Sequence, residues 1–218
     1  MPIHAILFDL EGTIINSETL WFQAAGNILA ARGIPKHPSL DTKMIGTSLE
    51  QTCALIKELH HVPDSLQELA RLLYAEFAIL HAHQVPFFTG FLTFFNAIRA
   101  QGMHTAIGTN TPAKLVHQIR TTPTLTSLFG RHIYTPESVN NRVKPAPDLY
   151  LIAAKNVDAA PENCLVIEDS IPGVRAAKQA GMQCIRLATT IPSLEILAGE
   201  NLVVTGYPEI PLAQLLHA

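Results

Sequence analysis

Short apolar runs that end in polar residues recur along this chain of 218 residues, and they mark its predicted strands. The run Ile6-Leu7-Phe8 leads directly into Asp9, and the run Leu165-Val166-Ile167 leads into Glu168. Apolar runs of this length, bounded by turn residues, are typical of strands that are buried on both faces. We expect strands at about 4–9, 103–109, 132–135, 164–168, 183–187 and 201–204.

Segments with helical character lie between these strands from residue 90 onward. This alternation predicts βα units and a parallel sheet, and therefore a protein of the α/β class. We expect helices at about 91–101, 112–121, 146–156, 172–181 and 210–217.

The chain between the first two predicted strands has a different pattern, with long amphipathic stretches and no convincing strand signal. Gly33 is a suitable end for the first stretch, and Asp64 is a suitable N-cap for the third. We expect residues 15–86 to form a small all-helical cap inserted after the first strand, with residues 1–14 and 87–218 forming the core. The expected helical stretches are about 17–32, 48–61 and 64–83.

Two carboxylates, Asp9 and Glu11, follow the first strand. Open α/β sheets bind their ligands at the carboxyl ends of the strands, so these acids occupy a position suited to chemistry. Asp9 can act as a nucleophile or a metal ligand, and Glu11 can donate and accept protons. A turn without chemistry is the alternative, since an acid followed by Gly12 is also a common exit from a sheet.

Three further groups of polar residues lie just past predicted strands or loops. Thr109 and Asn110 end the second strand, and their hydroxyl and amide groups can donate to phosphate oxygens without adding charge. The proline after Lys144 favours an extended conformation, which positions the ammonium group before the next helix begins. Glu168 and Asp169, an adjacent acid pair, end the fourth strand.

The order of these motifs resembles that of the haloacid dehalogenase superfamily of hydrolases, over nearly the whole chain. The sugar-phosphate phosphatases and β-phosphoglucomutase-like members are the most similar branch. The resemblance implies a Rossmann-like parallel sheet flanked by helices, with the first strand central and the cap closing over a small substrate. A packed helical subdomain without a gating role is the alternative for the insertion. The matching runs are Asp9-Leu10-Glu11-Gly12-Thr13, Asn16-Ser17-Glu18-Thr19-Leu20-Trp21, Thr109-Asn110, Lys144-Pro145 and Glu168-Asp169.

The resemblance also implies a phosphatase that acts on a small phosphorylated metabolite, with sugar phosphates first, through an aspartyl-phosphate on Asp9. Glu11 would protonate the leaving oxygen and later take a proton from water. Lys144 would neutralise charge on the transferring group, and Thr109 and Asn110 would bind its oxygens together with Lys144. Mg²⁺ would be held by Asp9, the backbone carbonyl of Glu11 and Asp169. Glu168 would lie behind these ligands as a partner of the metal and Lys144, with direct coordination of the metal as the alternative.

Two positions depart from the family pattern and keep other functions open. Most phosphatases of the family carry Asp where this chain has Glu11, which leaves a weakly active or non-catalytic metabolite-binding protein as one alternative. A phosphosugar mutase of the β-phosphoglucomutase type is the other, although such mutases place a histidine where this chain has Trp21. Trp21 itself can contact substrate or belong to the cap core.

Composition narrows the class of protein. A hydrophobic content of 48% is enough for a full core, and a net charge of −3 gives no electrostatic support for nucleic-acid binding. No stretch approaches the roughly 20 apolar residues that a membrane span needs. Three widely spaced cysteines favour reduced thiols. We expect a cytoplasmic protein that is a monomer or a small homo-oligomer.

Overall fold

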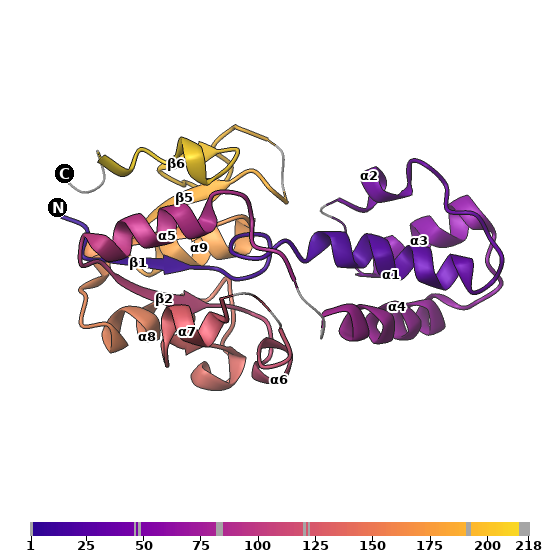
Figure 1. Cartoon of the computed structure of the whole chain (residues 1–218), viewed down its shortest axis with the longest axis horizontal. Helices are drawn as coiled ribbons and strands as arrows, with labels where there is room; N and C mark the ends of the chain where they lie inside the picture. Colours follow the sequence, from indigo (N-terminus) through magenta and orange to yellow (C-terminus); the bar gives the residue numbers. More distant parts are fainter. Residues whose placement is uncertain are drawn as a thin grey trace. The chain divides into compact units, whose positions relative to one another are not determined.

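The computed structural model describes residues 2–45, 47, 49–81, 85–119, 121, 123–190 and 193–213, in two compact units (Figure 1). The helical unit consists of Ser17–Val85 and Gln118–Arg120. The expected boundaries, 14/15 and 86/87, lie close to those of the two units. The α/β unit comprises Met1–Asn16, Pro86–His117 and Thr121–Ala218.

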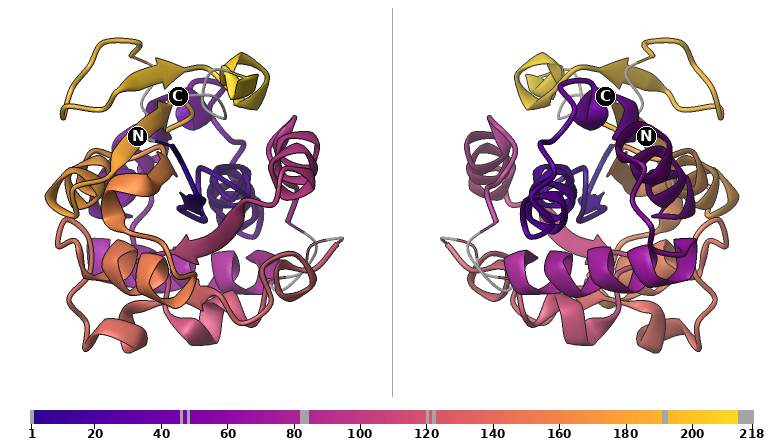
Figure 2. Two further views of the ribbon diagram at one scale, coloured as in Figure 1. Left: turned by 90° about the vertical axis from the view of Figure 1, so that its left-hand side faces the viewer. Right: turned by 90° about the vertical axis from the view of Figure 1, so that its right-hand side faces the viewer.

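One parallel sheet organises the described part of the α/β unit, with strand order β3-β2-β1-β4-β5-β6. The α/β class and the predicted strands are confirmed, and β1 is central as expected. Phe8 is level with Ile107 on one side and Ile167 on the other, so the carboxyl ends of these three strands coincide. The edge strand β6 is drawn in yellow in Figure 2. The bounds are β1 Ala5–Phe8, β2 His104–Gly108, β3 Ile133–Tyr134, β4 Cys164–Glu168, β5 Gln183–Leu187 and β6 Leu202–Val204.

Alternate residues of β1 serve two separate layers of core. Leu7 belongs to the cluster formed with helices α8 (Asp148–Asn156) and α9 (Ile171–Gln179). Phe8 points to the other layer, which includes helices α5 (Phe91–Ala100) and α7 (Leu125–Phe129). The centroid of its ring lies 5.9 Å from that of Phe91 and 5.8 Å from that of Phe129. The last strand residue before Asp9 is therefore anchored by aromatic packing.

The predicted helix over 112–121 is wrong in length. Helix α6 covers Ala113–Val116, and the separate helix α7 begins after Thr124, whose side chain accepts a hydrogen bond from the amide of Ser127. Pro123, which lacks a backbone N–H, lies between the two helices, just before α7 begins. The predicted helix at 210–217 lies partly outside the described residues. Short 3₁₀ turns occupy Pro136–Val139, Pro161–Asn163 and Tyr207–Glu209.

The regular elements described in the helical unit are all helices. Helix α2 was not predicted, since a five-residue helix leaves little periodic signal. The prediction of Asp64 as the N-cap residue of α4 is wrong. The N-cap is Ser65, whose Oγ accepts from the amide of Glu68 at 3.1 Å, whereas Asp64 forms an ion pair with Arg32 at 2.8 Å. Gly33, at φ +67°, ends the first helix as expected. The bounds are α1 Glu18–Ala30, α2 Leu40–Met44, α3 Leu49–His60 and α4 Leu66–His81.

A buried ion pair fastens the loop that follows β5. Arg186 is fully buried, and its Nε donates to Glu200 Oε1 at 2.7 Å. Its Nη2 donates to the carbonyl oxygens of Ser193 and Glu195, both at 2.8 Å. Burial raises the pKa of Glu200, but the hydrogen bonds from Arg186 and backbone amides outweigh it and lower the pKa to about 2.

In the described residues no helix is both long and apolar enough to cross a membrane.

We expect Glu200→Gln to lower the free energy of unfolding by about 3–5 kcal/mol at pH 7, because it leaves the buried guanidinium without its counter-charge. Since the pKa of Glu200 is depressed in the folded protein, the stabilisation exists above its ordinary value of 4.5 and is lost as the pH falls toward about 2. Urea unfolding of wild type and variant at several pH values measures this.

The exposed pair Arg71–Glu68 supplies the control for that measurement. Arg71→Gln should change the free energy of unfolding far less than Glu200→Gln, because solvent screens ion pairs at the surface. Equal effects of the two variants at pH 7 would show that burial adds nothing to the Arg186 pair.

Candidate active site

Asp9 lies at the end of β1, in the centre of the sheet edge where the strands end. Its backbone amide donates to the carbonyl of Ile167 at 3.0 Å, which extends the β1–β4 pairing by one residue. Asp9 is only 8% exposed to solvent. The carboxylate is therefore held by regular sheet structure and not by a flexible loop.

Lys144 is the cation of the site. Its side chain is 3% exposed, and Nζ donates to Asp9 Oδ1 at 2.5 Å and to Glu168 Oε1 at 2.6 Å. Nζ also lies 4.7 Å from the centre of the Tyr150 ring. The ammonium group thus joins the ends of β1 and β4.

Asn110 lies at the site but has a different set of contacts from those predicted. Its Oδ1 accepts from the backbone amide of Lys144 at 3.0 Å, and its Nδ2 donates to the carbonyl oxygen of Lys144 at 3.3 Å. The amide group therefore holds the Lys144 backbone. The binding of phosphate oxygens by Asn110 stays a prediction.

Glu168 is fully buried, and protein donors satisfy both of its oxygens. Oε1 accepts from Lys144 and from the Tyr150 hydroxyl at 2.9 Å, and Oε2 accepts from the amides of Asp169 and Ser170 and from the Ser170 hydroxyl. A Cβ on Gly173 would lie 1.7 Å from Glu168 Oε1, so only glycine permits this approach of α9. The carboxylate has no oxygen left over for a metal ion.

Asp169 occupies a separate pocket of hydroxyl groups. Thr13 donates to Oδ1 at 3.2 Å, and Thr190 donates to Oδ2. Gly12 has φ +81°, and a Cβ there would lie 2.2 Å from Asp169 Oδ2. The carbonyl oxygen of Gly12 accepts from the Thr189 hydroxyl at 2.6 Å. The loop after β5 therefore holds both Asp169 and the loop after β1 that carries Asp9 and Glu11, here called the first acidic loop.

Three buried carboxylates face a single ammonium group, and the pKa values reflect this imbalance. The pKa of Asp9 lies well above its ordinary value, mainly because the carboxyl group is buried. Lys144 lowers this pKa, whereas the charges of Glu168 and Asp169 raise it. Burial and the Glu168 charge raise the pKa of Asp169 to about 7. Burial lowers the pKa of Lys144, but Asp9 and Glu168 outweigh it and leave that pKa raised.

The donor set at this edge fits a hard cation such as Mg²⁺. Excess negative charge and oxygen-only donors suit that ion, which is bound through one or two carboxylates and usually retains water. No cluster of three or more His, Cys, Asp or Glu side chains suited to a metal occurs within the described ranges. The expected ligand set is compatible with this absence, because it uses only two such side chains, those of Asp9 and Asp169, together with the backbone carbonyl of Glu11.

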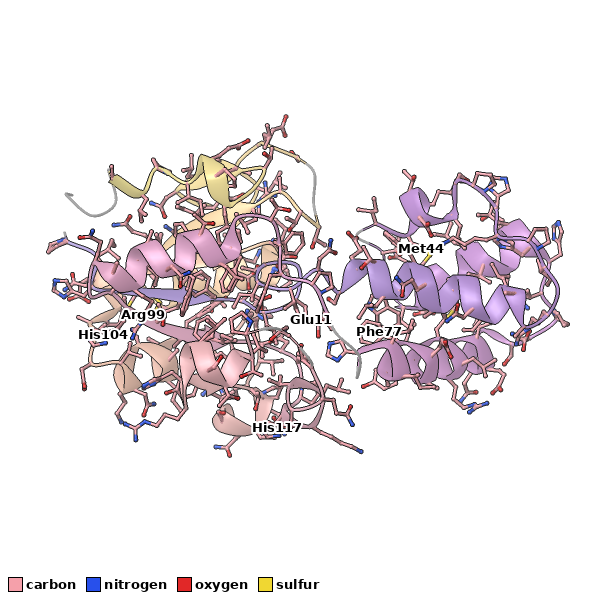
Figure 3. All side chains as sticks on the ribbon, in the orientation of Figure 1. Glu11, Met44, Phe77, Arg99, His104 and His117 are labelled. Carbon is pink, nitrogen blue, oxygen red and sulfur yellow. The ribbon has the colours of Figure 1, made fainter. Side chains whose placement is uncertain are left out.

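Glu11 extends beyond the end of β1 and is labelled in Figure 3. It is partly exposed, and its Oε1 accepts from the Thr111 hydroxyl at 3.0 Å. Thr109, at the end of β2, is 2% exposed, and its Oγ1 accepts from the amide of Thr111 at 3.0 Å. Glu11, Thr109 and Thr111 thus form one connected group across the ends of β1 and β2.

Several residues that hold the site were missed by the sequence analysis. Thr189 and Thr190 directly follow a strand that was predicted, so their position at the carboxyl end was a usable signal. Tyr150 and Tyr207 gave no signal, because a tyrosine in an apolar segment reads as core. The hydroxyl of Tyr207 donates to the carbonyl oxygen of Thr13 at 3.1 Å and braces the first acidic loop.

Trp21, the predicted cap residue, lies in α1 of the helical unit. Its ring stacks on Phe77 of α4 with centroids 4.0 Å apart and planes 13° apart. Phe77 in turn contacts His81 at 5.0 Å. The side chain is thus part of the packing between α1 and α4, and its contact with substrate stays a prediction.

Comparison with known proteins places this chain. Residues 6–187 match the model of the haloacid dehalogenase-like hydrolase family. A phosphorylated carbohydrates phosphatase of Thermotoga maritima is 24% identical over 84% of each chain. A crystal structure of a HAD family hydrolase from Deinococcus radiodurans, with bound phosphate and sodium, superposes with a TM-score of 0.77 at 30% identity, over 98% of this chain and 95% of that one.

A mutant of CbbY from Rhodobacter sphaeroides, in complex with xylulose 1,5-bisphosphate, has a TM-score of 0.68 at 26% identity, and the match covers 98% of this chain and 99% of that chain. The match of the family model to most of the chain agrees with the parallel sheet and with the acids at its carboxyl edge. This chain belongs to the haloacid dehalogenase-like hydrolases.

Proposed function

We propose that this protein is a phosphoric monoester hydrolase that acts on a small phosphorylated metabolite, with sugar phosphates first. The observation that carries the proposal is the contact of Lys144 Nζ with Asp9 Oδ1 at 2.5 Å, on a buried carboxylate at the end of the central strand. The relatives support the substrate class, since one is named for phosphorylated carbohydrates and others hold phosphate or a sugar bisphosphate.

Asp9 is the nucleophile in this proposal. One carboxylate oxygen bonds to Lys144, which leaves the other oxygen to attack phosphorus. The phosphorus–oxygen bond of the ester breaks, and the leaving oxygen takes the proton of Glu11. Glu11 then takes a proton from water, and the resulting hydroxide attacks phosphorus, releasing inorganic phosphate and free Asp9. The ammonium of Lys144 also favours the charged form of Asp9.

Mg²⁺ would be held by Asp9, the backbone carbonyl of Glu11 and Asp169. When bound, the ion supplies positive charge that allows an anionic carboxylate to approach an anionic phosphoryl group. The hydroxyl of Thr109 is assigned to a phosphoryl oxygen, because it donates no hydrogen bond to the protein among the contacts described above and lies at the same sheet edge. Asn110 acts on the Lys144 backbone.

The two alternatives are a phosphosugar mutase and a metabolite-binding protein without turnover. Trp21 stacked on Phe77 supplies no imidazole for a mutase-type proton transfer, which favours hydrolysis. Steady-state release of phosphate from a panel of sugar phosphates and from an aryl phosphate, with and without Mg²⁺, separates the three. A mutase isomerises a sugar phosphate with little release, and a binding protein releases none.

We expect Asp9→Asn to abolish phosphate release, by about 10³-fold or more, because an amide is a poor nucleophile. Phosphate release from the best substrate of the panel measures this, with circular dichroism as the check on folding. The same substitution at the exposed Asp158 is the matched control and should leave the rate unchanged. Wild-type turnover by the Asp9 variant would rule out an aspartyl-phosphate.

We expect Asp169→Asn to remove Mg²⁺ binding measured by isothermal titration calorimetry without substrate. Glu168→Gln should weaken the binding less, by about tenfold, because its oxygens bond to protein donors and act behind the ligands. An equal loss in the two variants would contradict this division of roles.

We expect Glu11→Gln to slow hydrolysis of a sugar phosphate by about 10²-fold, the usual worth of a positioned proton-transfer group. An aryl phosphate should be affected less, since its phenolate leaves without a proton. The ratio of the two kcat values, measured in both proteins, reports the effect. A variant that hydrolyses both substrates at wild-type rates would exclude Glu11 from proton transfer.

A further inference from the structure

Glu11 reaches a neighbouring strand end that an aspartate at the same position would approach less closely. Its side chain is longer by one methylene group, a length of about 1.5 Å. At that reach its Oε1 accepts a hydrogen bond of 3.0 Å from the Thr111 hydroxyl, across the ends of β1 and β2. Neither the family resemblance nor the sequence analysis assigned any role to Thr111.

Thr111 is itself held in place, so its hydroxyl is a fixed reference point. Its amide donates to Thr109 Oγ1 at 3.0 Å, and the amide of Thr109 donates to the carbonyl of Tyr134 in β3 at 3.0 Å. Thr109 is 2% exposed. A β-branched side chain also has restricted χ1 rotation, which limits where the Thr111 hydroxyl can lie.

We propose that Thr111 is the positioning residue that makes glutamate serviceable as the proton-transfer group of this enzyme. The inference rests on the proposed function of Glu11 and deepens it. The added methylene gives Glu11 one more torsion than aspartate has, and each staggered torsion offers three wells. The hydrogen bond from Thr111 selects among these conformers and fixes the carboxyl group at the end of β2.

The bond also divides the work between the two oxygens of Glu11. While Thr111 donates to Oε1, that oxygen acts as an acceptor, and a protonated carboxyl group carries its proton on Oε2. Oε2 is then the atom that gives its proton to the leaving oxygen and later receives one from water. The hydroxyl orients the acid without adding a charge to the site.

The test is a set of Thr111 variants assayed on a sugar phosphate and an aryl phosphate. Thr111→Val replaces the hydroxyl by a methyl group and should lower kcat on the sugar phosphate about tenfold, with KM unchanged and less than a twofold change on the aryl phosphate. Thr111→Ser keeps the hydroxyl and should restore most of the rate. Thr126→Val, at an exposed position of α7, is the control.

Double variants separate positioning of Glu11 from any other effect of Thr111. Thr111→Val should cause no further loss in a Glu11→Gln background, because the proton-transfer group is already absent. It should also have no effect in a Glu11→Asp background, where the carboxyl group falls short of the hydroxyl. Equal losses from Thr111→Val in all three backgrounds, or an increase in KM alone, would overturn the proposal.

Crystal structures of wild type and Thr111→Val decide the contact independently of turnover. We expect one Glu11 conformer bonded to Thr111 in the wild type, and a displaced or divided Glu11 side chain in the variant. An unchanged Glu11 in the variant would overturn the inference. If the wild type hydrolyses no phosphate ester, the proposed function fails, and the crystals still decide whether Thr111 fixes Glu11.

Discussion

The ammonium group of Lys144, buried between Asp9 and Glu168, is the interaction on which the rest of the site depends. Buried charges are costly unless their remaining hydrogen bonds are satisfied, and much of the surrounding structure meets that demand. Asn110 fixes the Lys144 backbone, and Tyr150 and two amides complete Glu168. The close approach of α9 at Gly173 serves the same end.

Neutral hydroxyl groups also surround the acids. Thr13 and Thr190 donate to Asp169, Thr111 donates to Glu11, and Thr189 holds the loop between them through Gly12. Hydroxyls orient carboxylates without cancelling their charge. The site therefore keeps an excess of negative charge that a divalent cation can balance.

The sequence predicted the parts of the site that one physical rule governs. Parallel strands end at one edge, so acids and a threonine that follow buried strands had to meet, as Asp9, Thr109, Glu168 and Asp169 do. The rule says nothing of short helices such as α6 and α7, which have four and five residues and leave little periodic signal in the sequence. It also could not divide roles among neighbours: Asn110 and Thr109 are equally polar in sequence, and only the structure shows that Asn110 holds the Lys144 backbone.

The two chain segments on either side of the helical insertion are hydrogen-bonded neighbours. Asn16 donates from its amide to the carbonyl of Pro86, and Phe88 donates to the carbonyl of Ile14, both at 2.9 Å. The insertion therefore leaves the core and returns to it at two points that lie side by side. Loop-closure entropy grows only slowly with length, so the core tolerates insertions of very different size at this point. The length of the inserted segment is thus uncoupled from the position of the acids at the sheet edge.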